Sequence, residues 1–229
     1  MSSTTDKIRS RGHWSITIRP NRYDNERVPY SDLEHLLLGS VVRLRGWPVP
    51  MIDSRLELIR GEDWIGEDID AAIVSHYEAW RFFTTGQFLQ LRSISADWRT
   101  GTEATAIPEG CGSVIEVWEI LFYLTEVFEL AARLALTSAG DDLMSVEVQL
   151  IGLKERCLIV GQRDRAEFLN PYPGPVEDLQ MTAHMLNIEL VSNSRGAAVD
   201  MAIEMFARFG WRPSREQLTE HQQELLSYS

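Results

Sequence analysis

The sequence lacks any apolar run long enough to cross a membrane. A spanning helix needs about 20 consecutive apolar residues, whereas the longest apolar stretch, residues 114–136, is interrupted by four glutamates and one arginine. The opening residues, MSSTTDKIRSRGHW, hold no apolar stretch either, so no secretory signal is predicted. We therefore expect a cytoplasmic protein without a membrane span, in which a disordered lead-in over residues 1–12 precedes a single domain over residues 13–229.

Cysteine is also scarce. Only Cys111 and Cys157 are present, far apart in the sequence and outside any CxxC pattern. Disulfide scaffolds and zinc clusters carry several cysteines at short spacings, so the sequence argues against both. Cys111 precedes a predicted helix, whose N-terminus would lower the thiol pKa, but no nearby residue supplies a catalytic base. We interpret it as structural.

Lysine is almost absent, and the charge is strongly negative. The chain has 22 basic and 34 acidic residues and a net charge of −12, and only Lys7 and Lys154 are lysines. An acidic chain is a poor general binder of phosphate, because non-specific affinity for nucleic acid comes from neutralised phosphates. The first sixty residues nevertheless carry slightly more basic than acidic side chains, which leaves a local basic patch open.

Motifs for nucleotides and nucleophilic catalysis are missing. The sequence contains no P-loop, no dinucleotide fingerprint and no G-x-S-x-G elbow. We therefore predict no cofactor and no metal, and an enzyme is the less favoured class.

The hydrophobic pattern predicts an α+β fold. HWSITIRP alternates with the period of a strand, and the segments 73–83 and 87–95 flank a TTGQ turn as a hairpin. Residues 113–136, with Ser113 as the N-cap, carry the stripe of a long helix. Because regular β-α-β alternation is missing, we expect a mainly antiparallel sheet with one long central helix and C-terminal helices.

Other segments carry weaker patterns. The sequence predicts a strand over residues 41–47, a loop or short edge strand over 60–70, and a second hairpin over 143–160 around its glycine. Residues 97–112 have the composition of a connector that would divide two layers. Residues 179–191 are ambiguous between strand and helix.

RLRGWPVP is the first candidate site. A strand would place Arg43, Arg45 and Trp47 on one outward face, where bases could stack on the indole while arginines hold phosphate. The structural alternative is a strand end, where arginine stems cover the tryptophan and pair with the acids of residues 53–70. The abundance of those acids favours the structural interpretation.

HYEAWRFF is the second candidate site. A regular strand puts His76, Glu78 and Trp80 on one face and Arg81 on the other. An H-x-E pair can ligate a metal, or join a histidine base to an orienting carboxylate. No third ligand follows at the usual spacing, so the sequence favours structural or salt-bridge roles.

The long helix poses an electrostatic question. If it is deeply buried, Glu119 and Glu126 need partners, because an unpaired buried charge is costly. An arginine from the N-terminal sheet is the expected partner, and Glu129 and Arg133 are spaced for an i,i+4 pair.

RLRGWPVP, EAWRFFTTGQF and LTEVFELAARLA together give the chain a family resemblance. Over residues 13 to about 210 it resembles an uncharacterised bacterial domain that accompanies Schlafen-type, AlbA-2-like domains assigned to DNA binding. The resemblance implies a bacterial origin and a place in a multi-gene system such as antiviral defence. It carries no residue roles with it, and no segment of the partner domain's kind is visible.

Three hypotheses follow. The leading one is a non-enzymatic bacterial interaction module that binds a partner protein, or itself, through an exposed face of aromatic and arginine residues: Arg43, Arg45, Trp47, Trp80 and Arg81. The second is a nucleic-acid-binding accessory protein that uses the Arg43, Arg45 and Trp47 face. The third is a metal-dependent hydrolase or nuclease built on His76, Glu78 and the acids of residues 63–70.

Overall fold

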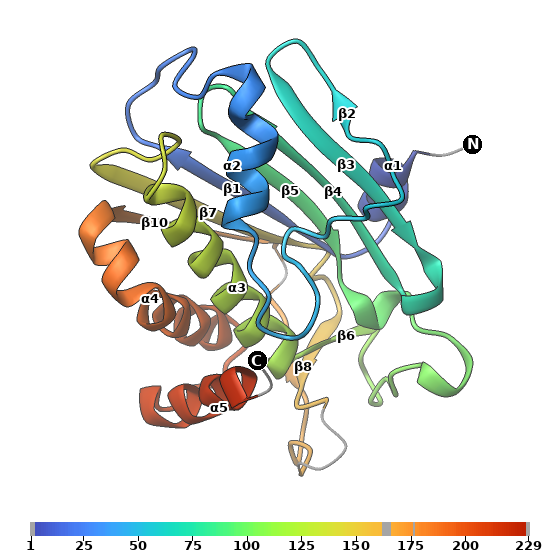
Figure 1. Cartoon of the computed structure of the whole chain (residues 1–229). Helices are drawn as coiled ribbons and strands as arrows, with labels where there is room; N and C mark the ends of the chain where they lie inside the picture. Colours follow the sequence, from blue (N-terminus) through green and yellow to red (C-terminus); the bar gives the residue numbers. More distant parts are fainter. Residues whose placement is uncertain (1–2, 162–165, 176, 228–229) are drawn as a thin grey trace.

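Helices cover one face of a large antiparallel sheet, as the α+β pattern predicts (Figure 1). The computed structural model describes residues 3–161, 166–175 and 177–227. The seven strands of the large sheet lie in the spatial order β10 (Leu179–Leu186), β7 (Leu143–Ile151), β1 (His13–Pro20), β5 (Phe88–Ser93), β4 (His76–Phe83), β3 (Trp64–Ala71) and β2 (Ile59–Arg60).

Strand alternation creates the core. Trp14, Ile16 and Ile18 point to the helix-covered face of β1 and are at most 1 % exposed, as their spacing predicts. The β4–β5 hairpin also forms as expected, with a turn that contains Gly86. The sequence pattern therefore locates the central strands of the sheet correctly.

The central helix α3 (Val117–Ala135) lies across the inner face of this sheet (Figure 1). It is buried around almost its whole circumference, because α4 (Asn187–Arg208) and α5 (Arg215–Ser227) pack on it from the other side. A short helix, α2 (Leu33–Ser40), covers the neighbouring part of the sheet after a 3₁₀ turn η1 (Tyr30–Asp32). The long central helix and the C-terminal helices are thus confirmed.

A second, small sheet lies at the start of α3. It contains β6 (Ser113–Glu116), β8 (Arg156–Ile159) and β9 (Tyr172–Pro173), and β6 runs parallel to β8. Two predictions are wrong here: Ser113 starts a strand rather than capping the helix, and β7 and β8 belong to different sheets rather than to one hairpin. The connector runs from β5 to this sheet through 3₁₀ turns η3 (Ser95–Asp97) and η4 (Gly101–Glu103).

From Ser3 onward, the lead-in that was predicted to be disordered is ordered. Residues 4–9 form helix α1 (Thr4–Arg9), whose N-cap Ser3 accepts a hydrogen bond from the backbone of Asp6. Ile8 is fully buried against Tyr77 and Ala79 on the outer face of the sheet. One apolar side chain and a capping box are too short a signal to predict this helix from the sequence.

Three further expectations change. Residues 41–47 form no strand and contribute only an isolated bridge between Val42 and Val49. The segment over residues 60–70, predicted as a loop or a short edge strand, instead overlaps the eight-residue strand β3, which lies between β4 and β2. The 3₁₀ turn η2 (Ala72–Val74) then leads into β4. The ambiguous segment 179–191 is both, because β10 ends at Leu186 and α4 starts at the next residue.

Cys111 and Cys157 form a disulfide, contrary to the sequence-based expectation. The parallel pairing of β6 with β8 brings the connector beside β8, although 46 residues separate the two cysteines. The bond therefore fastens the connector to the small sheet.

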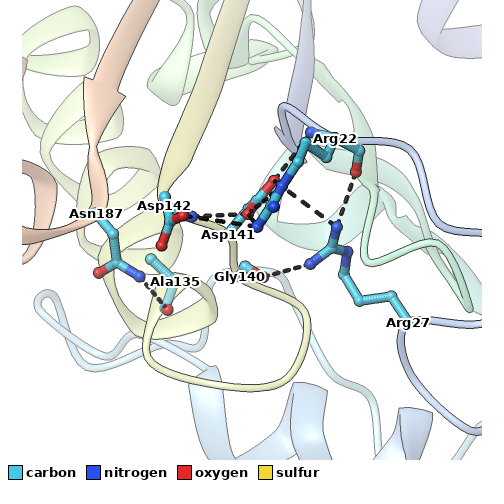
Figure 2. A network of polar contacts seen from close by, with 7 residues as sticks. All are labelled: Arg22, Arg27, Ala135, Gly140, Asp141, Asp142 and Asn187. Carbon is cyan, nitrogen blue, oxygen red and sulfur yellow. Dashed lines mark hydrogen bonds and ion pairs between the residues drawn. The ribbon is translucent and has the colours of Figure 1, made fainter.

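A polar clasp joins the end of β1 to the start of β7 (Figure 2). The buried carboxylate of Asp141 accepts hydrogen bonds from the guanidinium and the backbone N–H of Arg22, and Arg27 donates to the carbonyl of Gly140 at 2.8 Å. The hydrogen bonds from Arg22 hold the pKa of Asp141 far below its usual range.

Within the part of the chain that the structure describes, no helix is long and apolar enough to span a membrane.

Reducing the disulfide should lower the free energy of unfolding by about 2–4 kcal/mol, since the bond restricts a long loop in the unfolded chain. Urea unfolding with and without reductant measures this. The double variant Cys111→Ser/Cys157→Ser should match the reduced protein and ignore reductant. Equal stability of the oxidised and reduced protein would show that the bond does not form.

Asp141→Asn should destabilise the protein by about 1–3 kcal/mol at neutral pH, because the N–H donors of the clasp lose a charged acceptor. The pKa of Asp141 is lowered in the folded state, so its contribution is complete above the pKa of an unfolded aspartate and declines as the pH falls below it. Urea unfolding between pH 7 and pH 3 (roughly the carboxyl range) should show the two proteins converging at the acidic end. A constant difference would contradict the assignment.

Candidate functional site

A buried ion pair occupies the space between α3 and the large sheet. The guanidinium of Arg45 meets the carboxylate of Glu126 in a two-pronged contact, with Nε lying 2.8 Å from Oε1. The two side chains are only 8 % and 0 % exposed. This geometry is the strong form of an arginine–carboxylate pair, and it supplies the partner that a buried glutamate on this helix requires.

A bend in the chain turns Arg45 inward. Gly46 has a φ of +85°, a conformation that is strained for other residues, and the chain reverses there between Val42 and Val49. Trp47 lies 41 % exposed over the Arg45 guanidinium, 4.9 Å from ring centroid to carbon. Arg43 is exposed, so the three side chains form no outward row and the acids of residues 53–70 are not the partners of Arg45.

Arg92 adds a second positive charge below Glu126. It belongs to β5, lies 4.0 Å from Oε2 of Glu126 and sits over the ring of Tyr123 at 4.4 Å. Its Nε and Nη1 atoms have no hydrogen-bond partner among the described residues. Glu119, two turns earlier on α3, accepts a hydrogen bond from the backbone of Ser95 through one oxygen. The expected arginine from the sheet is thus found only for Glu126, as the more distant Arg92, while its main partner Arg45 comes from a loop. Among the described residues, Glu119 pairs with a backbone N–H and with no arginine.

The predicted partnership of Glu129 with Arg133 is wrong. Arg195 of α4 pairs with Glu129 at 2.7 Å, and the guanidinium of Arg133 donates to the carbonyl of Val41. Tertiary contacts supply better partners than the i,i+4 neighbour, because the helix is packed on all sides.

Glu78 is the centre of a network on β4. Its Oε2 lies 2.8 Å from Nε2 of His76, and its Oε1 accepts hydrogen bonds from the backbone of Met51 and the amide of Gln90, both at 2.8 Å. The hydroxyl of Tyr123 donates to the other end of the Gln90 amide at 3.0 Å. Burial raises the pKa of Glu78, but the hydrogen bond and charge of His76 outweigh it, so the pKa lies below the ordinary value.

This network fastens the segment that follows the bend. Besides the bond to Glu78, the carbonyl of Met51 accepts from the indole of Trp80 at 2.9 Å, and the backbone of Asp53 donates to Glu67 at 3.0 Å. Within the described ranges no cluster of three or more metal-ligating side chains occurs. Both oxygens of Glu78 are thus occupied in holding the fold, which favours the structural interpretation of the H-x-E pair.

The remaining predicted site residues, Trp80 and Arg81, lie on opposite faces of the sheet. Trp80 is 1 % exposed and belongs to the core. Arg81 lies on the outer face of the sheet, where it pairs with Asp68 at 2.7 Å and stacks on Trp64 at 4.8 Å. The five residues proposed as one binding face therefore do not share a surface.

Sequence reasoning missed Gln90 and Arg92. Both occupy the apolar face of the strand FLQLRS, opposite Trp80 and Glu78 in the register. Polar side chains that alternate on the buried face of a strand require partners, and this pattern in FLQLRS could have identified both residues as members of a buried network.

Comparisons with protein-family models, curated proteins and solved structures find no match to this chain.

Arg45→Ala should destabilise the protein by about 3–5 kcal/mol, because Glu126 is then buried with too little compensating charge. The double variant Arg45→Met/Glu126→Leu should recover much of this loss, since it removes both charges and keeps the volume. Chemical unfolding of the single and double variants measures the coupling. If the double variant is no more stable than Arg45→Ala, the pair is not the dominant contact.

Proposed function

We propose that this protein is an interaction module that pairs with a second copy of itself along the edge strand β10. The observation that supports this function is a row of unpaired backbone groups on an uncharged, eight-residue edge strand. β10 is the last strand of the large sheet, and among the described residues its backbone ladder involves β7 alone. Such an edge is a template for a further strand unless charge, proline or a covering element blocks it.

The register shows which groups are unpaired. The backbone N–H of Asn187 donates to the carbonyl of Asp142, and these two residues continue the β10–β7 register. Because partners alternate along an antiparallel strand, Leu179, Met181 and Ala183 face β7. Gln180, Thr182 and His184 consequently direct their backbone N–H and C=O groups outward, away from β7.

The side chains of β10 do not block the outward backbone groups of this edge. The exposed side chain of Gln180 reaches toward β7 and donates to Glu147 at 2.9 Å, and the His184 ring lies 2.9 Å from the hydroxyl of Ser145. Thr182 stands exposed between them. β10 itself, LQMTAHML, contains no proline, lysine, arginine or acid, so two copies could pair without placing like charges opposite one another despite a net charge of −12.

A two-fold axis near Thr182 would join two such strands in antiparallel order. The outward residues would then exchange about six backbone hydrogen bonds, two for each pair of facing residues. Exposed apolar side chains extend the contact at one end of the strand, where Leu186 and Ile188 flank Asn187. Leu136 lies next to them, because the Asn187 amide donates to the carbonyl of Ala135 at 2.8 Å (Figure 2).

The other hypotheses receive less support. The burial of Arg45 leaves Arg43 as the exposed arginine of the proposed nucleic-acid face, and Glu78 is occupied by three hydrogen-bond donors. Bacterial origin and a role in defence rest on the family resemblance alone and stay predictions. The cytoplasmic location also stays a prediction, and the disulfide counts against it, because such bonds persist mainly in oxidising compartments.

Thr182→Pro should convert a dimer into a monomer. The substitution removes the outward N–H at the centre of the pairing and leaves the β7 ladder intact, since proline is tolerated on a free strand edge. Sedimentation velocity over a wide concentration range measures the oligomeric state, and circular dichroism verifies the fold of the variant.

Thr182→Val is the matched control, because it keeps the N–H and the β-branched shape. It should dimerise like the unchanged protein. A protein that stays monomeric at the highest concentration would overturn the proposal, and so would a dimer that survives Thr182→Pro.

A further inference from the structure

The turn between β3 and β4 presents apolar side chains to solvent. Ile73 is 96 % exposed, Val74 is 65 % exposed, and Ala72 before them is exposed as well. Residues 71–75 carry no charged side chain. Exposed apolar residues that are scattered singly need no explanation, whereas these three follow one another at the end of a hairpin. We call residues 72–74 the apolar tip.

The residue after the apolar tip fixes its shape. Ser75 has a φ of +54°, a conformation that is costly for a residue other than glycine. Its backbone N–H donates to the carbonyl of Ala72 at 3.1 Å, and its hydroxyl donates to the carbonyl of Trp98 at 3.2 Å. Strain of this kind persists only where the surrounding structure enforces it. The apolar tip is therefore a fixed projection whose base is fastened to the segment after β5.

Two aromatic rings with a cation over each lie behind the apolar tip. Lys7 pairs with Asp70 at the end of β3, and its ammonium group lies 5.5 Å from the ring centroid of Tyr77. The guanidinium of Arg11 lies 4.2 Å from the ring centroid of Trp98, and the rings of Tyr77 and Trp98 are themselves 4.2 Å apart. Both cations thus contact residues that neighbour the tip in the strand or hold its base.

The local charge at this end of the sheet differs from that of the whole chain. Residues 3–12, which we call the basic segment, hold three basic side chains and one acidic side chain, whereas the chain has a net charge of −12. Arg9 is exposed, and among the described residues neither Arg9 nor Arg11 forms an ion pair with a carboxylate. The nearby carboxylate of Asp97 is held by Arg156 at 2.7 Å. Positive charge is therefore available beside the apolar tip.

We propose that this end of the sheet docks on an anionic lipid surface, with the apolar tip in the headgroup region and the basic segment on the lipid charges. Burial of apolar area and attraction to anionic lipids add together in this kind of binding. Long basic side chains and the rings of Tyr and Trp suit the boundary between lipid and water. The acidic remainder of the chain points away from the surface, and salt screens its repulsion beyond about 8 Å. This inference does not depend on pairing through β10.

Flotation of the whole protein with lipid vesicles tests the proposal. The protein should bind vesicles of phosphatidylcholine with phosphatidylserine, bind vesicles of phosphatidylcholine alone more weakly, and lose affinity as the salt concentration rises. Ile73→Ser should lower the partition onto the mixed vesicles by about tenfold, because a large apolar side chain no longer leaves water on docking. Leu169→Ser is the matched control, since Leu169 is fully exposed on another segment, and it should leave the partition unchanged.

Two further variants separate the apolar contribution from the electrostatic one. Ile73→Trp should strengthen binding to both kinds of vesicle, because tryptophan favours the membrane interface. Arg9→Gln should weaken binding to the mixed vesicles alone, with the exposed Arg43 in Arg43→Gln as its control.

Absence of binding to either kind of vesicle would overturn the proposal and leave the apolar tip to a protein partner. Equal binding to both kinds of vesicle would overturn it too, because the basic segment would then contribute nothing. It also fails if Ile73→Ser and Ile73→Trp both bind like the unchanged protein, or if Leu169→Ser loses as much affinity as Ile73→Ser.

Discussion

The charge of Glu126 in the middle of the core is the constraint on which the surrounding structure depends. A carboxylate that is 0 % exposed on the central helix requires a positive partner, because desolvation would otherwise exceed any gain from packing. Arg45 supplies it only because the chain bends at Gly46 and carries the guanidinium under Trp47. A strand through this segment, with its side chains alternating outward, would leave Glu126 with only the more distant charge of Arg92.

The bend has a second consequence further along the chain. It delivers Met51 to the inner face of β4, where the backbone N–H meets Glu78 and the carbonyl meets Trp80. The carboxylate that suggested catalysis in the sequence is thereby used to anchor a loop. Networks of this kind are strong only when every member is satisfied, and this explains why a histidine, a glutamine and a tyrosine surround one glutamate.

Local patterns predicted the elements that local forces determine. Period-two alternation identifies β1, β4 and β5, and the 3.6-residue stripe identifies the long helix, since both depend on neighbours in the sequence. The direction of Arg45 could not be read in this way, because its partner lies 81 residues later and the backbone between the two prolines and Val42 is irregular. The prediction for the two cysteines was wrong for the same reason. Two isolated cysteines reveal nothing of the parallel pairing of β6 with β8 that brings them together.

Polar groups without a partner mark the places where this structure can still form hydrogen bonds with another molecule. The buried charges of Glu78 and Glu126 have hydrogen-bond and ion-pair partners. Replacing them therefore tests the stability of the fold rather than a function. Among the described residues, the outward backbone groups of β10 have no strand partner. The edge of the sheet, rather than the ion pairs of the interior, is therefore where a second chain could pair without disturbing the core.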